Sequence, residues 1–186
     1  MITGIVIAIA LALSLAIVFL YNGLVSASQH VREAWGAIEV QLQRRASLIP
    51  NLVESVKGYA SYERDTMERV VSARGALTAA GSPRAAAQAN AELTSALGTF
   101  FAIAEAYPDL KANERFAQLQ SDLADTENKI AYARNYYNGA VEIYNVKVES
   151  FPGLLIAGPA GYRRAEFFAA EAGAAVAPAA APYGKA

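Results

Sequence analysis

The sequence contains no cysteine and only one histidine, His30, among its 186 residues. Without thiols the chain cannot form a disulfide, a cysteine-ligated zinc site or a cysteine nucleophile. Di-metal sites in helical bundles use two Glu-x-x-His motifs with further Glu residues, whereas the single histidine here begins "HVRE". A Ser-His-Asp triad would need the same histidine, and no nucleophile-elbow motif accompanies it. We therefore expect no catalytic residue, no metal ligand and no bound cofactor.

The chain also lacks an excess of charge of either sign. Its formal net charge is −1, and its basic and acidic residues are interleaved. This composition gives no basic surface for nucleic acid, so we expect no nucleic-acid partner. Glycine, proline and β-branched residues are sparse between residues 24 and 150. That scarcity favours helices over sheets and predicts an all-α protein.

No charged side chain occurs in the first 25 residues, "MITGIVIAIALALSLAIVFLYNGLV", and the first one is Arg32. About 20 apolar residues are enough to cross a bilayer. A cleaved signal peptide is the alternative, but such peptides carry a basic start and a shorter apolar stretch of roughly 7–15 residues. We therefore predict a single transmembrane anchor over residues 1–23, with the lipid bilayer as its partner.

The distribution of basic residues gives the orientation of the anchor. No basic side chain precedes the span, whereas Arg32, Arg44 and Arg45 follow it. Because basic residues are retained on the cytoplasmic side, the body of the protein is expected there.

Small residues recur at every fourth position within the span. Such a face lets a second helix approach closely and favours self-association, so the protein is expected to be a homo-oligomer. The general abundance of alanine is the alternative explanation. The residues of this face are Gly4, Ala8, Ala12 and Ala16.

After the anchor, apolar residues follow helical spacing from Val31 to Tyr59, and their phase continues through Pro50. Proline inside a helix costs about 3 kcal/mol, but it fits the first turn of a helix. A single helix over residues 22–78 would be about 85 Å long at ~1.5 Å per residue. This length is more than twice that of the helix expected at 84–106. Length matching thus favours a chain reversal at Pro50, with a kinked continuous helix as the alternative.

Two further breaks are expected at "AGSPR", residues 80–84, and at "AYPDLKAN", residues 106–113. In the first of them Ser82 can cap the next helix and Pro83 can begin it. The predicted fold is an antiparallel up-down four-helix bundle over residues 24–150. Its helices are expected near 24–47, 51–79, 84–106 and 109–150.

The C-terminal part divides into two segments. The segment 151–171 contains "FPGLLIAGPAGY" and is expected to lie at the membrane or beside the anchor. The remaining residues, 172–186, form a low-complexity Ala/Pro tail that is predicted to be disordered.

Asparagine and tyrosine residues share one face of the last predicted helix. One interpretation is a structural seam in which buried asparagines fix the register of the helices. The other is a surface that binds a peptide or another subunit. This polar seam comprises Asn128, Tyr132, Asn135, Asn138 and Asn145.

The predicted reversal at Pro50 defines a distal tip with Arg44, Arg45 and Asn51. We interpret the two arginines as a solvated helix end that offsets the helix dipole. The alternative is that they contact an anion or a partner protein.

Two long motifs carry a family resemblance. "WGAIEVQLQRRASLIPNLVESVKGYASYE", residues 35–63, and "NERFAQLQSDLADTENKIAYARNYYNGAVEIYN", residues 113–145, are followed by "FPGLLIAG". Together they resemble the LemA family of bacterial membrane-anchored helical proteins. The resemblance implies a protein of the bacterial cytoplasmic membrane with a helical bundle, and it supplies no catalytic residues.

We therefore predict a non-enzymatic, membrane-anchored scaffold that self-associates and binds membrane or membrane-proximal proteins. A ligand- or metal-binding bundle with enzymatic activity is one alternative hypothesis. An oligomeric membrane-remodelling protein is another.

Overall fold

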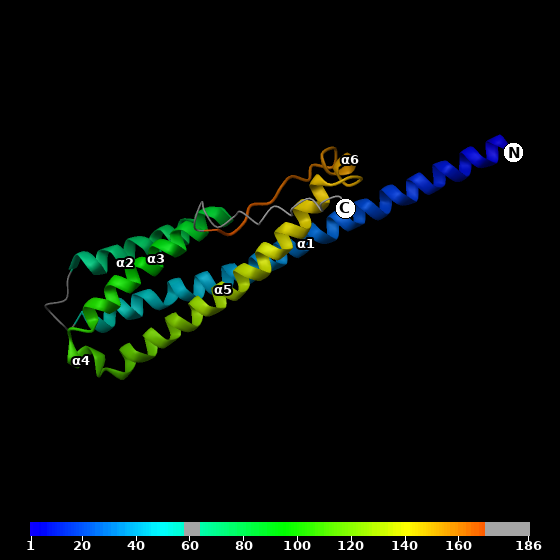
Figure 1. Ribbon diagram of the computed structural model, residues 1–186. Helices are drawn as coiled ribbons and strands as arrows, with labels where there is room; N and C mark the ends of the chain where they lie inside the picture. The colour runs from blue at the N-terminus through cyan, green and yellow to red at the C-terminus, as the bar shows by residue number, and fades with distance from the viewer. Residues whose placement is uncertain (58–63, 170–186) are drawn as a thin grey trace, which may run out of the picture. The chain divides into compact units, whose positions relative to one another are not determined.

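The computed structural model describes residues 1–57 and 64–169, and every regular element in these ranges is a helix. The all-α prediction is therefore confirmed (Figure 1). The helices are α1 (Ile2–Val56), α2 (Arg64–Ala79), α3 (Pro83–Ala104), α4 (Pro108–Lys111), α5 (Glu114–Glu149) and α6 (Leu154–Ala157). The predicted tail 172–186 lies outside the described residues.

The chain divides into two compact units. The first comprises residues 1–41 and 129–167, and the second comprises residues 42–128 together with the chain from residue 168. Both long helices, α1 and α5, contribute to each unit.

In the first unit, α5 runs antiparallel to α1. The Lys147 ammonium donates a hydrogen bond to the Gly23 carbonyl at 3.2 Å, and farther along the pair the Tyr136 hydroxyl lies 3.2 Å from His30 Nε2. Between them lies an apolar core of Leu24, Ala27, Tyr144, Val148 and Ala157.

Local capping explains the helix boundaries in the second unit. The Ser82 hydroxyl accepts a hydrogen bond from the Ala85 amide at 3.2 Å, and Pro83 begins α3. The Asn113 side chain accepts bonds from the first amides of α5, those of Arg115 and Phe116. Side-chain oxygens at these positions satisfy amides that have no partner within the helix. The predicted breaks at 80–84 and 106–113 are therefore confirmed.

The predicted reversal at Pro50 is wrong. Pro50 lies inside α1, which continues to Val56. The alternative, a helix that continues through the proline, describes the chain correctly. The Ser47 hydroxyl donates to the Arg44 carbonyl at 2.7 Å, a bond within the uninterrupted helix.

Burial and one long-range hydrogen bond explain why the helix continues through Pro50. Ile49 and Leu52 are fully buried, so reversing the chain here would expose apolar surface. Pro50 has no amide hydrogen, which leaves the Ala46 carbonyl without its usual partner one turn later. The Nε of Arg74 in α2 donates to this carbonyl at 2.9 Å. A side chain from another helix thus replaces the missing backbone donor.

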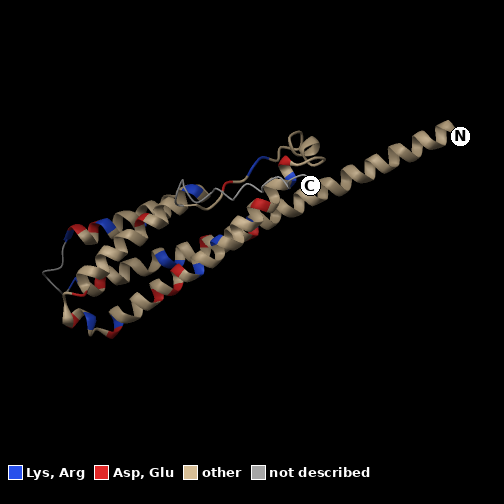
Figure 2. Ribbon diagram, viewed as in Figure 1, with Lys and Arg blue, Asp and Glu red and all other residues tan. Residues whose placement is uncertain are grey.

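The N-terminal part of α1 is long and apolar enough to cross a membrane, with a mean hydropathy of 2.8 over its most apolar window. None of that window is buried within the protein. Figure 2 shows that this part of the helix carries no charged side chain. Its large side chains face outward along its whole length: Ile5 is 59% exposed, Leu13 60% and Phe19 80%.

Candidate functional site

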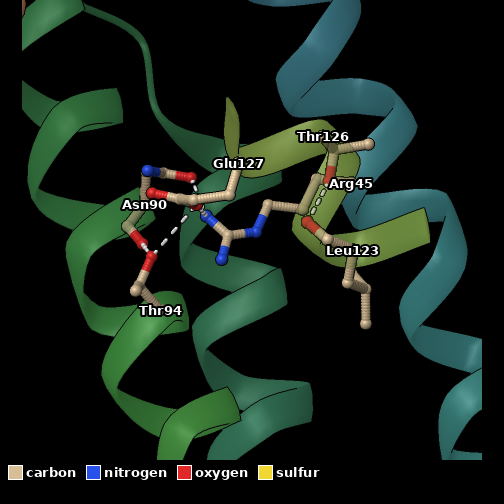
Figure 3. A network of polar contacts seen from close by, with 6 residues as sticks. All are labelled: Arg45, Asn90, Thr94, Leu123, Thr126 and Glu127. Carbon is tan, nitrogen blue, oxygen red and sulfur yellow. Dashed lines mark hydrogen bonds and ion pairs between the residues drawn. The ribbon is translucent and has the colours of Figure 1, made fainter. Parts of the chain in front are cut away.

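A buried arginine lies where three helices of the second unit meet. Arg45 of α1 is only 3% exposed. Its Nη1 donates to the side-chain oxygen of Asn90 in α3 at 2.6 Å, and the same nitrogen forms an ion pair with the Glu127 carboxylate of α5 (Figure 3). One guanidinium thus connects α1, α3 and α5.

Two threonines complete this arginine network, which comprises Arg45, Asn90, Thr94, Thr126 and Glu127. The Thr94 hydroxyl donates to the Asn90 carbonyl at 2.9 Å and lies 3.4 Å from a Glu127 carboxylate oxygen. The fully buried Thr126 donates to the Leu123 carbonyl at 2.8 Å. Of these bonds, only the Thr94–Glu127 contact links α3 to α5, while the other two each lie within one helix (Figure 3).

Burial lowers the pKa of the Arg45 guanidinium, and the Glu127 carboxylate opposes part of this shift. Arginine nevertheless keeps its proton in proteins, so Arg45 is a fixed positive charge and does not transfer protons. Its Nε is buried without a partner among the described residues. The guanidinium therefore has a structural role, as a fixed charge that links three helices.

The predicted distal tip does not form. Arg45 is buried, and Arg44 pairs with Asp125 at 3.4 Å in a half-exposed surface ion pair. Pro50 and Asn51 are exposed on α1, inside the helix. The interpretation of both arginines as a solvated helix end is therefore wrong, because the helix does not end there.

The predicted polar seam is buried at one end only. Asn128, Tyr132 and Asn135 are exposed, Asn138 is half-buried and Asn145 is 4% exposed. The buried-seam interpretation is therefore wrong at Asn128 and Asn135, while the binding-surface interpretation of the exposed residues stays a prediction.

Asn145 instead holds a segment without regular secondary structure, the strap, which comprises residues 158–167. Its side-chain oxygen accepts the Ala165 amide at 2.8 Å, and its nitrogen donates to the Ala165 carbonyl at 3.1 Å. The Tyr144 and Tyr137 hydroxyls donate to the Arg163 and Glu166 carbonyls, both at 2.8 Å. Burial and the nearby Glu166 carboxylate raise the pKa of Tyr137 to about 12, so its hydroxyl remains a donor at neutral pH.

Other predicted residues are placed but not brought into a site. The small-residue face of Gly4, Ala8, Ala12 and Ala16 is exposed on α1. His30 lies half-exposed, 3.7 Å from a Glu33 carboxylate oxygen. Within residues 1–57 and 64–169, no group of three or more His, Cys, Asp or Glu side chains could hold a metal ion.

Sequence reasoning missed Asn90, Glu127 and Arg74. Asn90 did carry a signal, because it continues the helical spacing of the buried Leu93 and Leu97. A polar residue in an apolar phase predicts a buried hydrogen-bond partner. Nothing local to Glu127 or Arg74 indicated which residue each would meet.

The arginine network predicts unequal effects for two ion pairs. The Glu127→Gln substitution leaves the Arg45 charge buried without its counter-charge, which costs about 3–5 kcal/mol in a fully buried pair. Because Glu127 is 41% exposed, we expect the unfolding free energy to fall by about 2 kcal/mol. The double variant Arg45→Met/Glu127→Gln should recover most of this loss.

The matched control is Arg44→Gln, which removes an exposed pair and should cost at most about 0.5 kcal/mol. Urea unfolding of the full chain in a mild detergent, followed by circular dichroism, measures all three variants. Equal losses for Glu127→Gln and Arg44→Gln would contradict the stabilising role of the network.

Comparison with known proteins places this architecture in a family. A model of the LemA family matches residues 34–180. Magnetosome proteins MamQ 1 and MamQ 2 of Paramagnetospirillum magneticum are each 26% identical over 174 residues, which cover 80% of this chain and 64% of the relative. Protein LemA of Metamycoplasma hominis is 23% identical over 131 residues, covering 70% of this chain and 60% of that protein.

The chain thus spans less than two thirds of the length of these relatives. The family match nevertheless includes both long motifs, the buried arginine, the proline within α1 and the strap. The protein therefore belongs to the LemA family.

Proposed function

We propose that this protein is a membrane-anchored, non-enzymatic helical scaffold of the bacterial cytoplasmic membrane. The N-terminal part of α1 serves as a single-pass anchor. The remaining helices form an antiparallel bundle that presents a surface to membrane or membrane-proximal proteins.

The observation that carries this proposal is the uniform exposure of apolar side chains along the start of α1. A soluble protein buries such a helix or pairs it, since exposed apolar surface costs about 25 cal/mol per Å². Lipid hydrocarbon provides the matching environment. The helical part that follows has its own core and caps, as expected of a body attached to an anchor.

The cytoplasmic side is supported by the charge pattern. The first charged side chain after the anchor is Arg32, which is exposed on α1. Cytoplasmic flanks retain basic residues of this kind.

Fractionation of cells that express the full chain tests the anchor and its side. We expect the protein to remain in carbonate-washed membranes with its N-terminal peptide intact. Because the chain has no cysteine, a Ser72→Cys variant reports the side through an impermeant maleimide. Labelling should occur only after the inner membrane is opened. A soluble product that begins after "VSAS" would instead show a cleaved signal peptide and contradict the proposal.

We further propose that the anchors self-associate through their small-residue face. An Ala12→Cys variant should then form disulfide-linked dimers in oxidised membranes. The matched control is Ala10→Cys, which lies about 160° around the helix from Ala12. Equal crosslinking at the two positions would count against a specific face.

A further inference from the structure

The chain leaves the end of α5 through a short hook that carries exposed apolar side chains. The hook comprises residues 151–157, including α6. Its Phe151 is 80% exposed, Leu154 56% and Leu155 65%. A soluble surface seldom keeps three large apolar side chains together in so short a segment.

The hook is fixed to the end of the proposed anchor. Ala157 is buried in the core with Leu24 and Ala27 of α1, and Ile156 packs against the same core. Figure 1 shows α6 beside α1, at the end of α5. The hook is therefore held against α1 just beyond its most apolar part.

A glycine makes this attachment possible. A Cβ atom on Gly153 would lie 2.2 Å from the Lys147 carbonyl oxygen, a backbone atom that cannot move aside. The chain can fold back over the end of α5 only because this position has no side chain. The close approach at Gly153 thus defines the path of the hook in the first unit.

A pocket of about 250 Å³ opens between the hook and α1. Phe19 and Leu20 contribute its anchor side, and Val146 and Phe151 its other side. Lys147 lies at the same pocket and donates one hydrogen bond, to the Gly23 carbonyl. An ammonium has three donors, so two have no partner among the described residues and can bind an anionic group.

Two aromatic side chains lie close to the hook in the first unit. The rings of Tyr21 in α1 and Tyr162 in the strap meet edge to face, with centroids 6.2 Å apart. Tyrosines concentrate at the boundary between hydrocarbon and headgroups. Their position agrees with a membrane interface at the hook.

We propose that the hook enters the bilayer interface and that its pocket binds one acyl chain of a membrane phospholipid, whose phosphate pairs with Lys147. This inference rests on the anchor function proposed above. The apolar lining selects a hydrocarbon chain, and the neighbouring ammonium selects the phosphate at its end. Free phosphate would leave the apolar lining unfilled.

Spin-label depth measurements distinguish the hook from the anchor. Single cysteines are introduced by Ile9→Cys, Leu155→Cys and Tyr132→Cys into the full chain in phosphatidylcholine/phosphatidylglycerol vesicles. Power saturation compares collisions with oxygen, which concentrates in hydrocarbon, against a water-soluble nickel complex. Tyr132 is the matched control, because it is exposed on α5 about 25 Å before the hook at ~1.5 Å per residue.

The expected result is oxygen-accessible labels at positions 9 and 155 and a nickel-accessible label at 132. A deep label at 9 with a nickel-accessible label at 155 would overturn the hook and leave the anchor standing. A nickel-accessible label at 9 would overturn both. A label at 155 that neither reagent reaches would indicate a second copy on this surface, and it also overturns the proposal.

The pocket is tested separately by filling it. Gly23 lines the pocket, and a Cβ atom there meets only the flexible end of Lys147, at 3.9 Å. The Gly23→Leu variant should retain several-fold less phospholipid than the unmodified chain in native mass spectrometry from detergent. Gly36→Leu, on α1 outside the pocket and with open space around its Cβ, is the matched control and should retain the normal amount. Unchanged retention in Gly23→Leu would overturn the lipid site.

Discussion

The second unit depends on one hydrogen bond, which the Ala46 carbonyl accepts from outside its own helix. Pro50 cannot donate to it, and a buried carbonyl without a partner costs about 1–3 kcal/mol. Arg74 supplies the bond from α2. Because this donor replaces the missing amide, α1 continues through the proline and keeps Ile49, Leu52 and Val56 fully buried. The helix that begins with the apolar anchor segment therefore also contributes to the core of the second unit.

The arginine network uses the same turn of α1. Arg45 immediately precedes Ala46, so its guanidinium reaches α3 and α5 while the Ala46 carbonyl reaches α2. Two neighbouring residues of α1 thus bond to three other helices. Removing one partner of such a pair is costly, because the other charge is then left buried without compensation. Such an arrangement suits a protein whose proposed task is to hold a fixed helical surface at a membrane.

Local sequence signals predicted the helix boundaries. The features that these signals missed depend on contacts between residues far apart in the sequence. Ser82 with Pro83 marked the start of α3 correctly, because a cap bonds to amides two or three residues away. Pro50 was misjudged, because its compensating donor lies 28 residues beyond Ala46. The unbroken apolar phase through the proline was the signal that favoured a continuous helix. Arg45 was misplaced at a solvated end for the same reason, since Asn90 lies 45 residues away. The long apolar start of α1 followed directly from composition.

A double-mutant cycle between Pro50 and Arg74 tests the central claim most directly. With Pro50 present, the Arg74→Met substitution should lower the unfolding free energy by about 1–3 kcal/mol, because it leaves the Ala46 carbonyl unpaired. In the Pro50→Ala background, the new amide can bond to that carbonyl, and the cost of Arg74→Met should be smaller by at least about 1 kcal/mol. Urea unfolding of the full chain in detergent measures the four free energies. An equal cost of Arg74→Met in both backgrounds would contradict the account.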